Sequence, residues 1–270
     1  MTDIIFLAIV GLASGLAGGL LGIGGSVIML PTLAIVFAHR HPPEYQHIYQ
    51  AAAMIMNFFV AFPATISHFK KQMILWPIVK WIIPAAFIGI FIGVACSNLP
   101  IFMGTGATHL KHLLGLFLLY VLSYNLYRII RKNRLQDITN DDAQKISPIL
   151  SFGVVGFPMG FLAGLLGIGG GSLCVPLQQV FLKMPLPRAI ANSATTIMCI
   201  SIFGAIYKNL TIPANIGGAS AALKLAAIVV PTSIIGGYLG AKLTYLLPRN
   251  IVRGTFCCLM LYAGVKLILS

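Results

Sequence analysis

The chain contains one glycine-rich segment twice, and this repeat constrains the fold more than any other feature of the sequence. Residues 15–31 read GLAGGLLGIGGSVIMLP, and residues 160–176 read GFLAGLLGIGGGSLCVP. The copies lie 145 residues apart, share the core LGIGG and close on the equivalent residues Pro31 and Pro176. An internal repeat of this kind indicates that the chain is built from two copies of one structural unit.

A second pair of matching segments and a polar stretch set the limits of the two units. WIIPAAFIGIFIG at 81–93 matches IVVPTSIIGGYLG at 228–240, with one proline and two glycines in register. Between the units, residues 128–147 hold five of the 18 basic residues and three of the five acidic ones. We therefore expect a first repeat at 1–130, a solvated linker at 131–148 and a second repeat at 149–270.

Both units consist of apolar runs long enough to cross a bilayer. Only 9% of the residues are Asp, Glu, Lys or Arg and 58% are hydrophobic, whereas a soluble domain has about 25% charged residues. This composition excludes a soluble enzyme, a disordered chain and a nucleic-acid-binding protein. A spanning helix needs about 20 apolar residues, which predicts spans near 50–68, 78–98, 113–130, 190–207, 225–246 and 251–269. Two further runs, 4–38 and 149–182, are too long for one span and are interrupted by glycine.

The basic residues predict how the two repeats are oriented. Lys and Arg gather on the cytoplasmic side of membrane proteins, so the basic linker is expected there. If the run 149–182 turns back as a hairpin, five basic residues of the second repeat fall on that side, and Lys208, Lys224 and Lys266 fall opposite. The predicted fold is an all-α polytopic membrane protein with two inverted repeats, each a glycine-broken helical hairpin plus three transmembrane helices. Hydropathy leaves open whether the hairpins re-enter or cross completely.

The glycine breaks form the predicted substrate site. A helix interrupted within the bilayer is tolerated only inside protein or beside a water-filled cavity. The second half-helix, expected to end near Pro31 or Pro176, begins with unpaired N–H groups that favour an anion. Two such N-termini, brought together by the repeat, would bind an anion near the midplane. The site residues predicted at the breaks are Gly22, Gly24, Gly25, Ser26, Gly167, Gly169, Gly170, Gly171 and Ser172. Close helix packing is the alternative role for these glycines.

Uncharged polar residues in the helix after each break are further candidates for substrate binding. They are Asn57 in the first repeat and Asn192, Ser193, Thr195 and Thr196 in the second. Such side chains can donate hydrogen bonds to an anion without adding charge. They can equally join helices or bond to their own helical turn, and both interpretations stay open.

Titratable groups inside the spans are expected to be scarce. All five acidic residues fall at the terminus or in loops, whereas ion-coupled carriers usually place a carboxylate within the membrane. Any coupling is therefore expected to run through a histidine, through the substrate's own protonation, or not at all. His68 is the candidate for gating or proton transfer, with a position at the membrane interface as the alternative. His109 and His112 have no acidic residue or cysteine beside them, so neither a metal site nor a cofactor is predicted.

The duplicated glycine motif followed by proline resembles the sulfite exporter family (TauE/SafE), over essentially the whole chain. His68 in ISHFKKQMILW occupies a position where members of that family often carry a histidine. The sequence departs from the family pattern at Ser26, which replaces the third glycine of the first copy, and the second repeat has Tyr207 near the position matching His68. The resemblance implies transport of small sulfur-containing or carboxylated anions across the bacterial inner membrane.

The predicted function is secondary transport, as an exporter, of a small sulfur-containing or organic anion such as sulfite, a sulfonate or thiosulfate. A passive anion channel and a carrier of small carboxylates are the alternatives. An enzyme is not predicted, because the spans offer neither a nucleophile–base pair nor a metal cluster. The expected partners are the small anion and the lipid bilayer, without nucleic acid. The protein is expected to be a multi-pass monomer or homodimer in the cell inner membrane.

Overall fold

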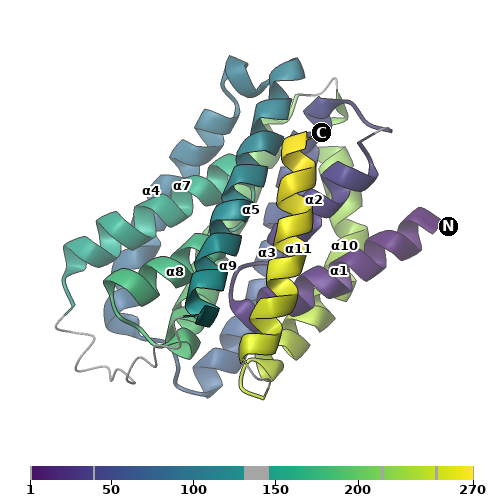
Figure 1. Cartoon of the computed structure of the whole chain (residues 1–270). Helices are drawn as coiled ribbons and strands as arrows, with labels where there is room; N and C mark the ends of the chain where they lie inside the picture. Colours follow the sequence, from purple (N-terminus) through teal and green to yellow (C-terminus); the bar gives the residue numbers. More distant parts are fainter. Residues whose placement is uncertain (1, 39, 131–145, 214–215, 247–248, 270) are drawn as a thin grey trace.

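The computed structural model describes residues 2–38, 40–130, 146–213, 216–246 and 249–269, which form helices with no strand among them (Figure 1). The first repeat contains α1 (Thr2–Leu21), α2 (Ser26–Val36), α3 (Gln46–Lys70), α4 (Trp76–Ser97) and α5 (Ala107–Ile130). The second repeat contains the π-helix η4 (Leu150–Gly156), which continues into α7 (Phe157–Leu166), then α8 (Gly171–Phe181), α9 (Leu186–Thr211), α10 (Gly218–Leu243) and α11 (Arg249–Leu269). Short 3₁₀ turns lie in the connections: η1 (Pro43–Tyr45), η2 (Pro100–Phe102) and η3 (Gly104–Gly106). A broken pair followed by three long helices therefore occurs twice.

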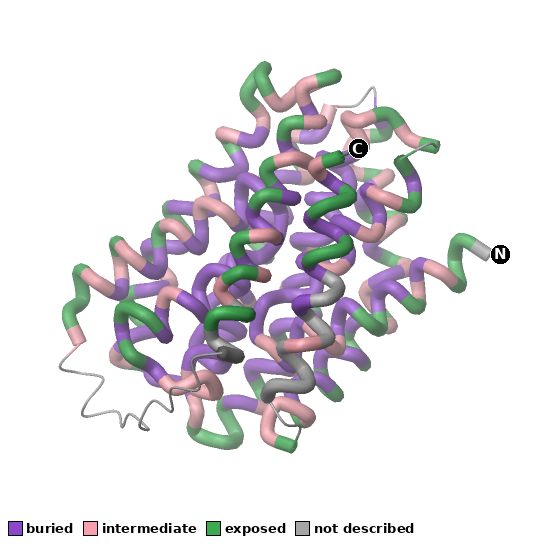
Figure 2. The backbone as a smooth tube through the Cα atoms, in the orientation of Figure 1, coloured by how far each residue is buried: buried purple, intermediate pink, exposed green. Residues whose placement is uncertain are grey.

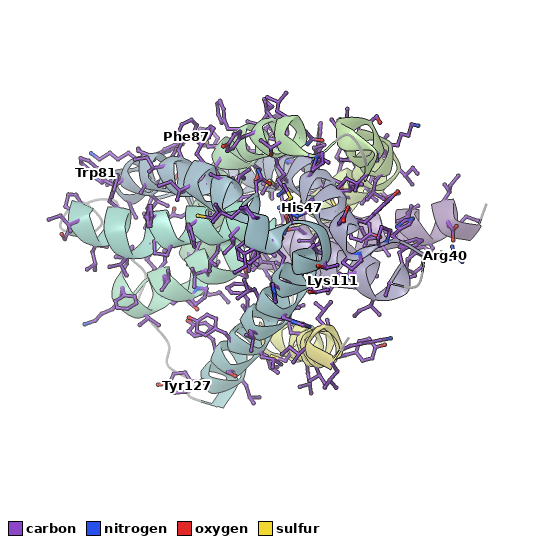
Figure 3. The ribbon with its side chains drawn as sticks, turned by 90° about the horizontal axis from the view of Figure 1, so that it is seen from above. Arg40, His47, Trp81, Phe87, Lys111 and Tyr127 are labelled. Atoms are coloured by element: carbon purple, nitrogen blue, oxygen red, sulfur yellow. The ribbon has the colours of Figure 1, made fainter. Side chains whose placement is uncertain are left out.

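Long apolar helices with apolar outer faces mark the chain as a multi-pass membrane protein. Within the described residues, six helices are long and apolar enough to cross a membrane, at 3–21, 43–70, 76–97, 104–124, 186–211 and 218–243. The labelled side chains of Trp81, Phe87 and Tyr127 lie at the perimeter, whereas His47 lies among the helices (Figure 3). Buried residues fill the centre of the bundle and exposed ones its outside (Figure 2). Exposed apolar surface of this extent suits lipid rather than water, and the predicted all-α polytopic fold is confirmed.

The helices pair across the two repeats through glycine. Helix α1 packs along α10, and α7 packs along α4. A Cβ at Gly19 would overlap the backbone of Gly237, and a Cβ at Gly164 would lie 2.7 Å from the backbone nitrogen of Val94. Glycine therefore allows these helices to approach closely, and the same crossing is built twice. Helices α5 and α11 also lie side by side and run in opposite directions (Figure 1).

Both predicted helix breaks are present. Helix α1 ends at Leu21 and α2 begins at Ser26, while α7 ends at Leu166 and α8 begins at Gly171. Five glycines in the breaks have φ between +64° and +78°, a conformation that favours glycine: Gly22, Gly24, Gly167, Gly169 and Gly170. The breaks are therefore built into the sequence.

The expectation that the second half-helices end near their prolines is wrong. Pro31 and Pro176 lie inside α2 and α8, which continue to Val36 and Phe181. A proline removes one N–H from a helix and disfavours its continuation. Here the helix nevertheless passes the proline and gains another turn of buried packing, so the proline does not mark the helix end.

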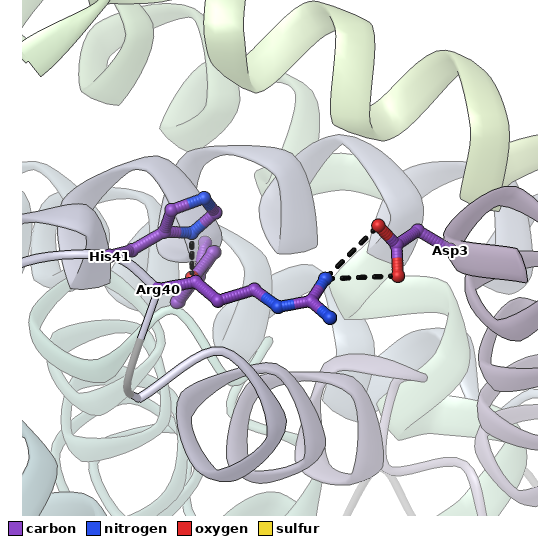
Figure 4. A network of polar contacts seen from close by, with 4 residues as sticks. Asp3, Arg40 and His41 are labelled. Atoms are coloured by element: carbon purple, nitrogen blue, oxygen red, sulfur yellow. Dashed lines mark hydrogen bonds and ion pairs between the residues drawn. The ribbon is translucent and has the colours of Figure 1, made fainter.

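The start of α1 is joined to the connection between α2 and α3 at the surface. Arg40 Nη1 lies 3.1 Å from both carboxylate oxygens of Asp3, and His41 Nδ1 lies 2.7 Å from Tyr49 Oη (Figure 4). The side chains of Arg40 and Asp3 are 62% and 59% exposed, so their ion pair contributes at most about 1 kcal/mol. Burial, and to a smaller extent Arg40, lowers the pKa of His41.

Candidate functional site

The two helix breaks lie against each other in the interior. A Cβ at Gly171 would lie 2.6 Å from Ile23 Cα, and a Cβ at Gly24 would lie 3.6 Å from Ile168 O. The start of α8 therefore touches the first break, and Gly24 faces the second. Every residue at 22–26 and at 167–172 is buried. The breaks form one central region that is closed to solvent in this conformation.

Asn57 of α3 lies between the two breaks. Its Oδ1 accepts a hydrogen bond from the Ser26 N–H at 3.1 Å, and its Nδ2 donates to Ser26 Oγ at 2.9 Å. A Cβ at Gly24 would lie 2.8 Å from Asn57 Oδ1, and a Cβ at Gly169 would lie 2.7 Å from Asn57 Nδ2. Glycine at both positions thus makes room for this carboxamide. Asn57 caps the N-terminus of α2 from a neighbouring helix, in the manner of an N-cap side chain.

The N-terminus of α8 has no such cap. The N–H groups of Leu173 and Cys174 bond to Gly170 O, and the first amides of a helix have no partner within it. Ser172 is 2% exposed, and its Oγ has no hydrogen-bond partner. A buried hydroxyl without a partner costs about 1–3 kcal/mol. The start of α8 therefore keeps an unsatisfied donor and the positive end of a helix in the centre of the molecule.

The four polar candidates in α9 are all buried, and each has a partner. Ser193 Oγ donates to Gly22 O at 2.7 Å, which joins α9 to the first break. Asn192 Oδ1 accepts from the Leu75 N–H at 2.8 Å, and its Nδ2 donates to Gln178 Oε1 at 3.0 Å. Thr195 and Thr196 donate to carbonyls four residues earlier in α9. The contacts of Asn192 and Ser193 fit the helix-joining interpretation, and those of Thr195 and Thr196 fit bonding to their own helical turn. Ser193 is the member of this group with a direct contact to a break.

His68 lies at the C-terminal end of α3 and is fully buried. Its Nδ1 lies 2.7 Å from Tyr245 Oη, while its Nε2 is buried without a partner. Lys71 Nζ lies 3.6 Å from the centre of the Tyr245 ring. Burial raises the pKa of Tyr245 to about 12, although Arg188 acts in the opposite direction. His68 therefore lies inside the bundle rather than on its outer surface, and its role in gating or proton transfer stays a prediction.

Sequence reasoning missed the burial of Lys208, which it placed on the side of the membrane opposite the linker. Lys208 is instead fully buried near the end of α9. Its Nζ lies 2.9 Å from His47 Nδ1, 2.7 Å from Ser97 Oγ and 3.0 Å from Asn98 Oδ1. A lysine near the end of a spanning helix normally extends to the interface, so hydropathy alone gave no sign of burial.

The spacing of the internal repeat could have indicated that Lys208 is equivalent to His68. Lys208 follows His68 by 140 positions, and Tyr245 follows Asn98 by 147 positions. The spacing of 147 is the one that relates the matched segments of α4 and α10. The contact of Lys208 with Asn98 is therefore the counterpart of the contact of His68 with Tyr245.

The polar groups at the centre are amides and hydroxyls. Among the residues that the structure describes, no three His, Cys, Asp or Glu side chains gather closely enough to hold a metal ion. Polar side chains at the breaks include the Asn57 carboxamide and the Ser26, Ser172 and Ser193 hydroxyls. The chemistry available there is hydrogen bonding.

Known sequences place this architecture in a family. The model of the family described as Sulfite exporter TauE/SafE matches residues 7–267. The chain belongs to this family. The resemblance noted from the glycine motif is therefore confirmed over nearly the whole length.

Curated relatives of this TauE/SafE protein are described as probable membrane transporter proteins. MamO of Magnetospirillum gryphiswaldense is 26% identical over 99% of this chain and 45% of its own length, so the chain spans about half of that relative. MJ0441 of Methanocaldococcus jannaschii is 31% identical over 74% of this chain and 70% of its own length. YunE of Bacillus subtilis is 25% identical over 97% of this chain and 98% of its own length. No solved structure matches the chain. The protein is a multi-pass membrane protein of the TauE/SafE family.

Proposed function

We propose that this protein is a secondary transporter, working as an exporter, for a small sulfur-containing or organic anion such as sulfite, a sulfonate or thiosulfate. The observation that carries the proposal is the start of α8, where the buried Ser172 hydroxyl lacks a partner beside the first break. Amide N–H groups, a hydroxyl donor and the positive end of a helix together suit an oxyanion. They hold it without a cationic side chain.

The proposed binding site consists of both glycine breaks together with Asn57 and Ser193. Asn57 contacts the first break, and Ser193 bonds to its Gly22 carbonyl. We assign Asn192, Thr195 and Thr196 an indirect part, since their hydrogen bonds hold α9 to α4, to α8 and to itself. An anion at the breaks would lie near the middle of α3, about half-way through the bilayer.

The contacts at the two ends of α3 support an inverted relation between the repeats. His47 and His68 are 21 residues apart in one helix, which corresponds to about 32 Å. His47 contacts Lys208 and His68 contacts Tyr245, so equivalent contacts lie at opposite ends, as inverted repeats require. We therefore keep 1–130 and 149–270 as the two transmembrane repeats. The expected cytoplasmic linker, 131–148, lies outside the described residues apart from 146–148.

Complete burial of both breaks favours a carrier over an open channel. A carrier must close around its site and open to each side in turn, and residues 22–26 and 167–172 are buried from both sides. A channel would keep a continuous aqueous path to this region. The proposed location is the cytoplasmic membrane of the cell.

Flux measurements in proteoliposomes test the proposal. Purified protein should take up labelled sulfite with saturation, and sulfite on the opposite side should accelerate the uptake by exchange. Thiosulfate, sulfoacetate and acetate, added as competitors, rank the substrate classes. Uptake of cations alone, or no uptake of any of these anions, would reject the proposal. Unsaturated conductance would replace the carrier with the anion channel.

A single charge at the centre tests the sign of the substrate. Asn57→Asp keeps an acceptor for the Ser26 N–H and adds a negative charge between the breaks. Two like charges about 4 Å apart repel by about 4 kcal/mol at an effective dielectric constant of about 20, so sulfite uptake should fall more than about 100-fold. The control Ser220→Asp adds the same charge at an exposed position and should leave uptake unchanged. Equal uptake by the two variants would contradict an anionic substrate at the breaks.

A further inference from the structure

Helix α3 carries a line of buried polar side chains along its whole length. Gln46, Gln50, Asn57, Thr65 and His68 are all less than 8% exposed, at 1%, 0%, 0%, 7% and 0%. At about 100° per residue these positions fall within an arc of about 100°, and at about 1.5 Å per residue they span about 33 Å. The hydrocarbon core of a bilayer is about 30 Å thick. Buried polar side chains therefore recur along one face of α3 over the thickness of a membrane, with the apolar Met54, Ala61 and Ala64 between them.

Five polar atoms along this face have no hydrogen-bond partner within the described residues. Among the described residues, buried atoms without a hydrogen bond include both amide atoms of Gln46, Oε1 of Gln50, Oγ1 of Thr65 and Nε2 of His68. Folded proteins leave few such groups unsatisfied, because each one costs free energy unless water or a ligand meets it. Water or a bound solute is the partner that buried groups of this kind normally have.

The equivalent positions on α9 are mostly apolar, which shows that the fold does not require polar side chains on this face of the helix. A Cβ at Gly167 would lie 2.9 Å from Gln50 Cβ, and a Cβ at the equivalent Gly22 would lie 2.8 Å from Ile190 Cγ2. Gln50 and Ile190 are 140 positions apart, the same spacing as His68 and Lys208. This spacing matches Gln46, Gln50, Asn57, Thr65 and His68 with Leu186, Ile190, Ile197, Ala205 and Lys208. Four of the five equivalents are apolar, so packing alone is satisfied without polar residues.

The line runs through the proposed binding site. Gln50 Nε2 donates to Leu165 O at 3.2 Å, close to the second break. Asn57 lies between both breaks, and His68 contacts Tyr245 at the far end of the helix. The polar face thus extends from the centre toward both ends of α3.

We propose that this face of α3 is the route along which the anion and its water cross the protein. Gln46 and Gln50 contact the solute on one side of the central site, and Thr65 and His68 contact it on the other. The contacts are uncharged or singly titratable, so a small oxyanion binds to each only weakly and moves on. This assignment rests on the proposed function and adds Gln46, Gln50 and Thr65 to its residues.

Polar-to-apolar substitutions separate a route from a structural role. Gln46→Leu and Thr65→Val remove side-chain groups that have no partner, so the thermal unfolding temperature in detergent should stay equal or rise. Sulfite uptake should fall about tenfold or more. This is the effect expected when the anion loses one hydrogen bond of about 1.4 kcal/mol as it crosses the protein. The matched control Thr232→Val removes a hydroxyl that bonds within α10 and should keep uptake within about twofold.

Thiol labelling tests the route without reference to the substrate. Cysteines introduced as Gln46→Cys and Thr65→Cys should react with a charged, membrane-impermeant thiosulfonate faster than Phe59→Cys, a position that is 37% exposed on the apolar outside of α3. Mass spectrometry reads the modification at the introduced residue against the wild-type protein. Labelling at 46 and 65 no faster than at 59, with unchanged uptake in Gln46→Leu and Thr65→Val, overturns the route. If wild-type protein carries no sulfite but 46 and 65 label rapidly, the proposed substrate fails and the route stands.

Discussion

Helices α3 and α9 occupy equivalent places in the two repeats and differ in how their polar groups are used. On α9, Asn192, Ser193, Thr195 and Thr196 all have hydrogen-bond partners within the protein. On α3, four of the six buried polar side chains have an atom without one. The two equivalent helices thus differ in how many buried polar atoms lack a partner: among the described residues, five on α3 and one on α9, Asn209 Oδ1. This difference supports placing the proposed route along α3.

The two breaks differ in the same way. At the first break, Asn57 caps α2 through Ser26. At the second, the residue equivalent to Asn57 is Ile197, whose Cδ1 would lie 2.7 Å from a Cβ at Gly171. The start of α8 therefore faces an apolar side chain from α9 and keeps its Ser172 hydroxyl unpaired. In the proposed site each repeat would contribute one part: the first the carboxamide of Asn57 and the second the uncapped N-terminus of α8.

The largest effect on stability is expected from Asn192→Ala in α9. Removal of this side chain leaves the buried Leu75 N–H and Gln178 Oε1 without the partners they have at 2.8 and 3.0 Å. Each unsatisfied group costs about 1–3 kcal/mol, so the free energy of unfolding should fall by about 2–4 kcal/mol. Thermal or denaturant unfolding in detergent measures the change.

Thr196→Val, one turn further along α9, is the matched control for Asn192→Ala. It removes a hydroxyl that bonds only to the Asn192 carbonyl and should cost less than about 1 kcal/mol. If Asn192→Ala keeps its stability and loses transport, Asn192 contacts the substrate directly and the contrast between α9 and α3 fails.

Smaller effects are expected from Ser193→Ala and Ser172→Ala: the first should lower stability, and the second should weaken sulfite binding without lowering stability. Ser193 donates to Gly22 O at 2.7 Å, so its loss should lower the free energy of unfolding by about 1 kcal/mol. The Ser172 hydroxyl has no partner, so its loss should leave stability equal or slightly higher while the half-saturating sulfite concentration rises about tenfold.

The two serine variants are measured side by side by thermal unfolding and by sulfite uptake. A loss of stability in Ser172→Ala comparable to that in Ser193→Ala would show that Ser172 has a structural partner. An unchanged half-saturating concentration in Ser172→Ala would remove it from the binding site.

The helices and the helix breaks could be predicted from the sequence because they depend on local and repeated patterns. The glycines at 22–25 and 167–170 break their helices since several adopt positive φ, and long apolar runs between polar connections become helices. The equivalent glycines on α4 and α10 predict close helix contacts for the same local reason. These features need no knowledge of which helices meet.

The sequence was not sufficient for the site because burial and pairing depend on which helices meet. Lys208 looks like an interfacial lysine until α9 is placed beside His47 of α3 and the end of α4. Gln46 and Gln50 gave no signal in a helix that also carries interfacial residues, and their missing partners are visible only once the interior is packed. Asn192 and Asn57 look alike as sequence, yet one joins helices and the other lies between the breaks.

The smallest expected effect concerns the ends of the two helices, where His68 of α3 contacts Tyr245 and Lys208 of α9 contacts Asn98. Burial raises the pKa of Tyr245 to about 12, above its ordinary value of about 10. The stability contributed by the neutral hydroxyl is therefore fully present below about pH 10 and is lost as the pH rises from about 10 to 12. Tyr245→Phe lacks this contribution, so the wild-type protein should lose stability more steeply than the variant above about pH 10.

Thermal unfolding of both proteins between pH 8 and 11.5 measures the difference, and Asn98→Ala supplies the comparison at the other end. That substitution removes the contact equivalent to Tyr245 without removing a phenol, so its stability should stay parallel to wild type across the same pH range. Parallel curves for wild type and Tyr245→Phe would mean that the Tyr245 hydroxyl is exposed to solvent. In that case the contact between His68 and Tyr245 would not be buried, and it would no longer match the contact of the buried Lys208 with Asn98 at the other end of α3.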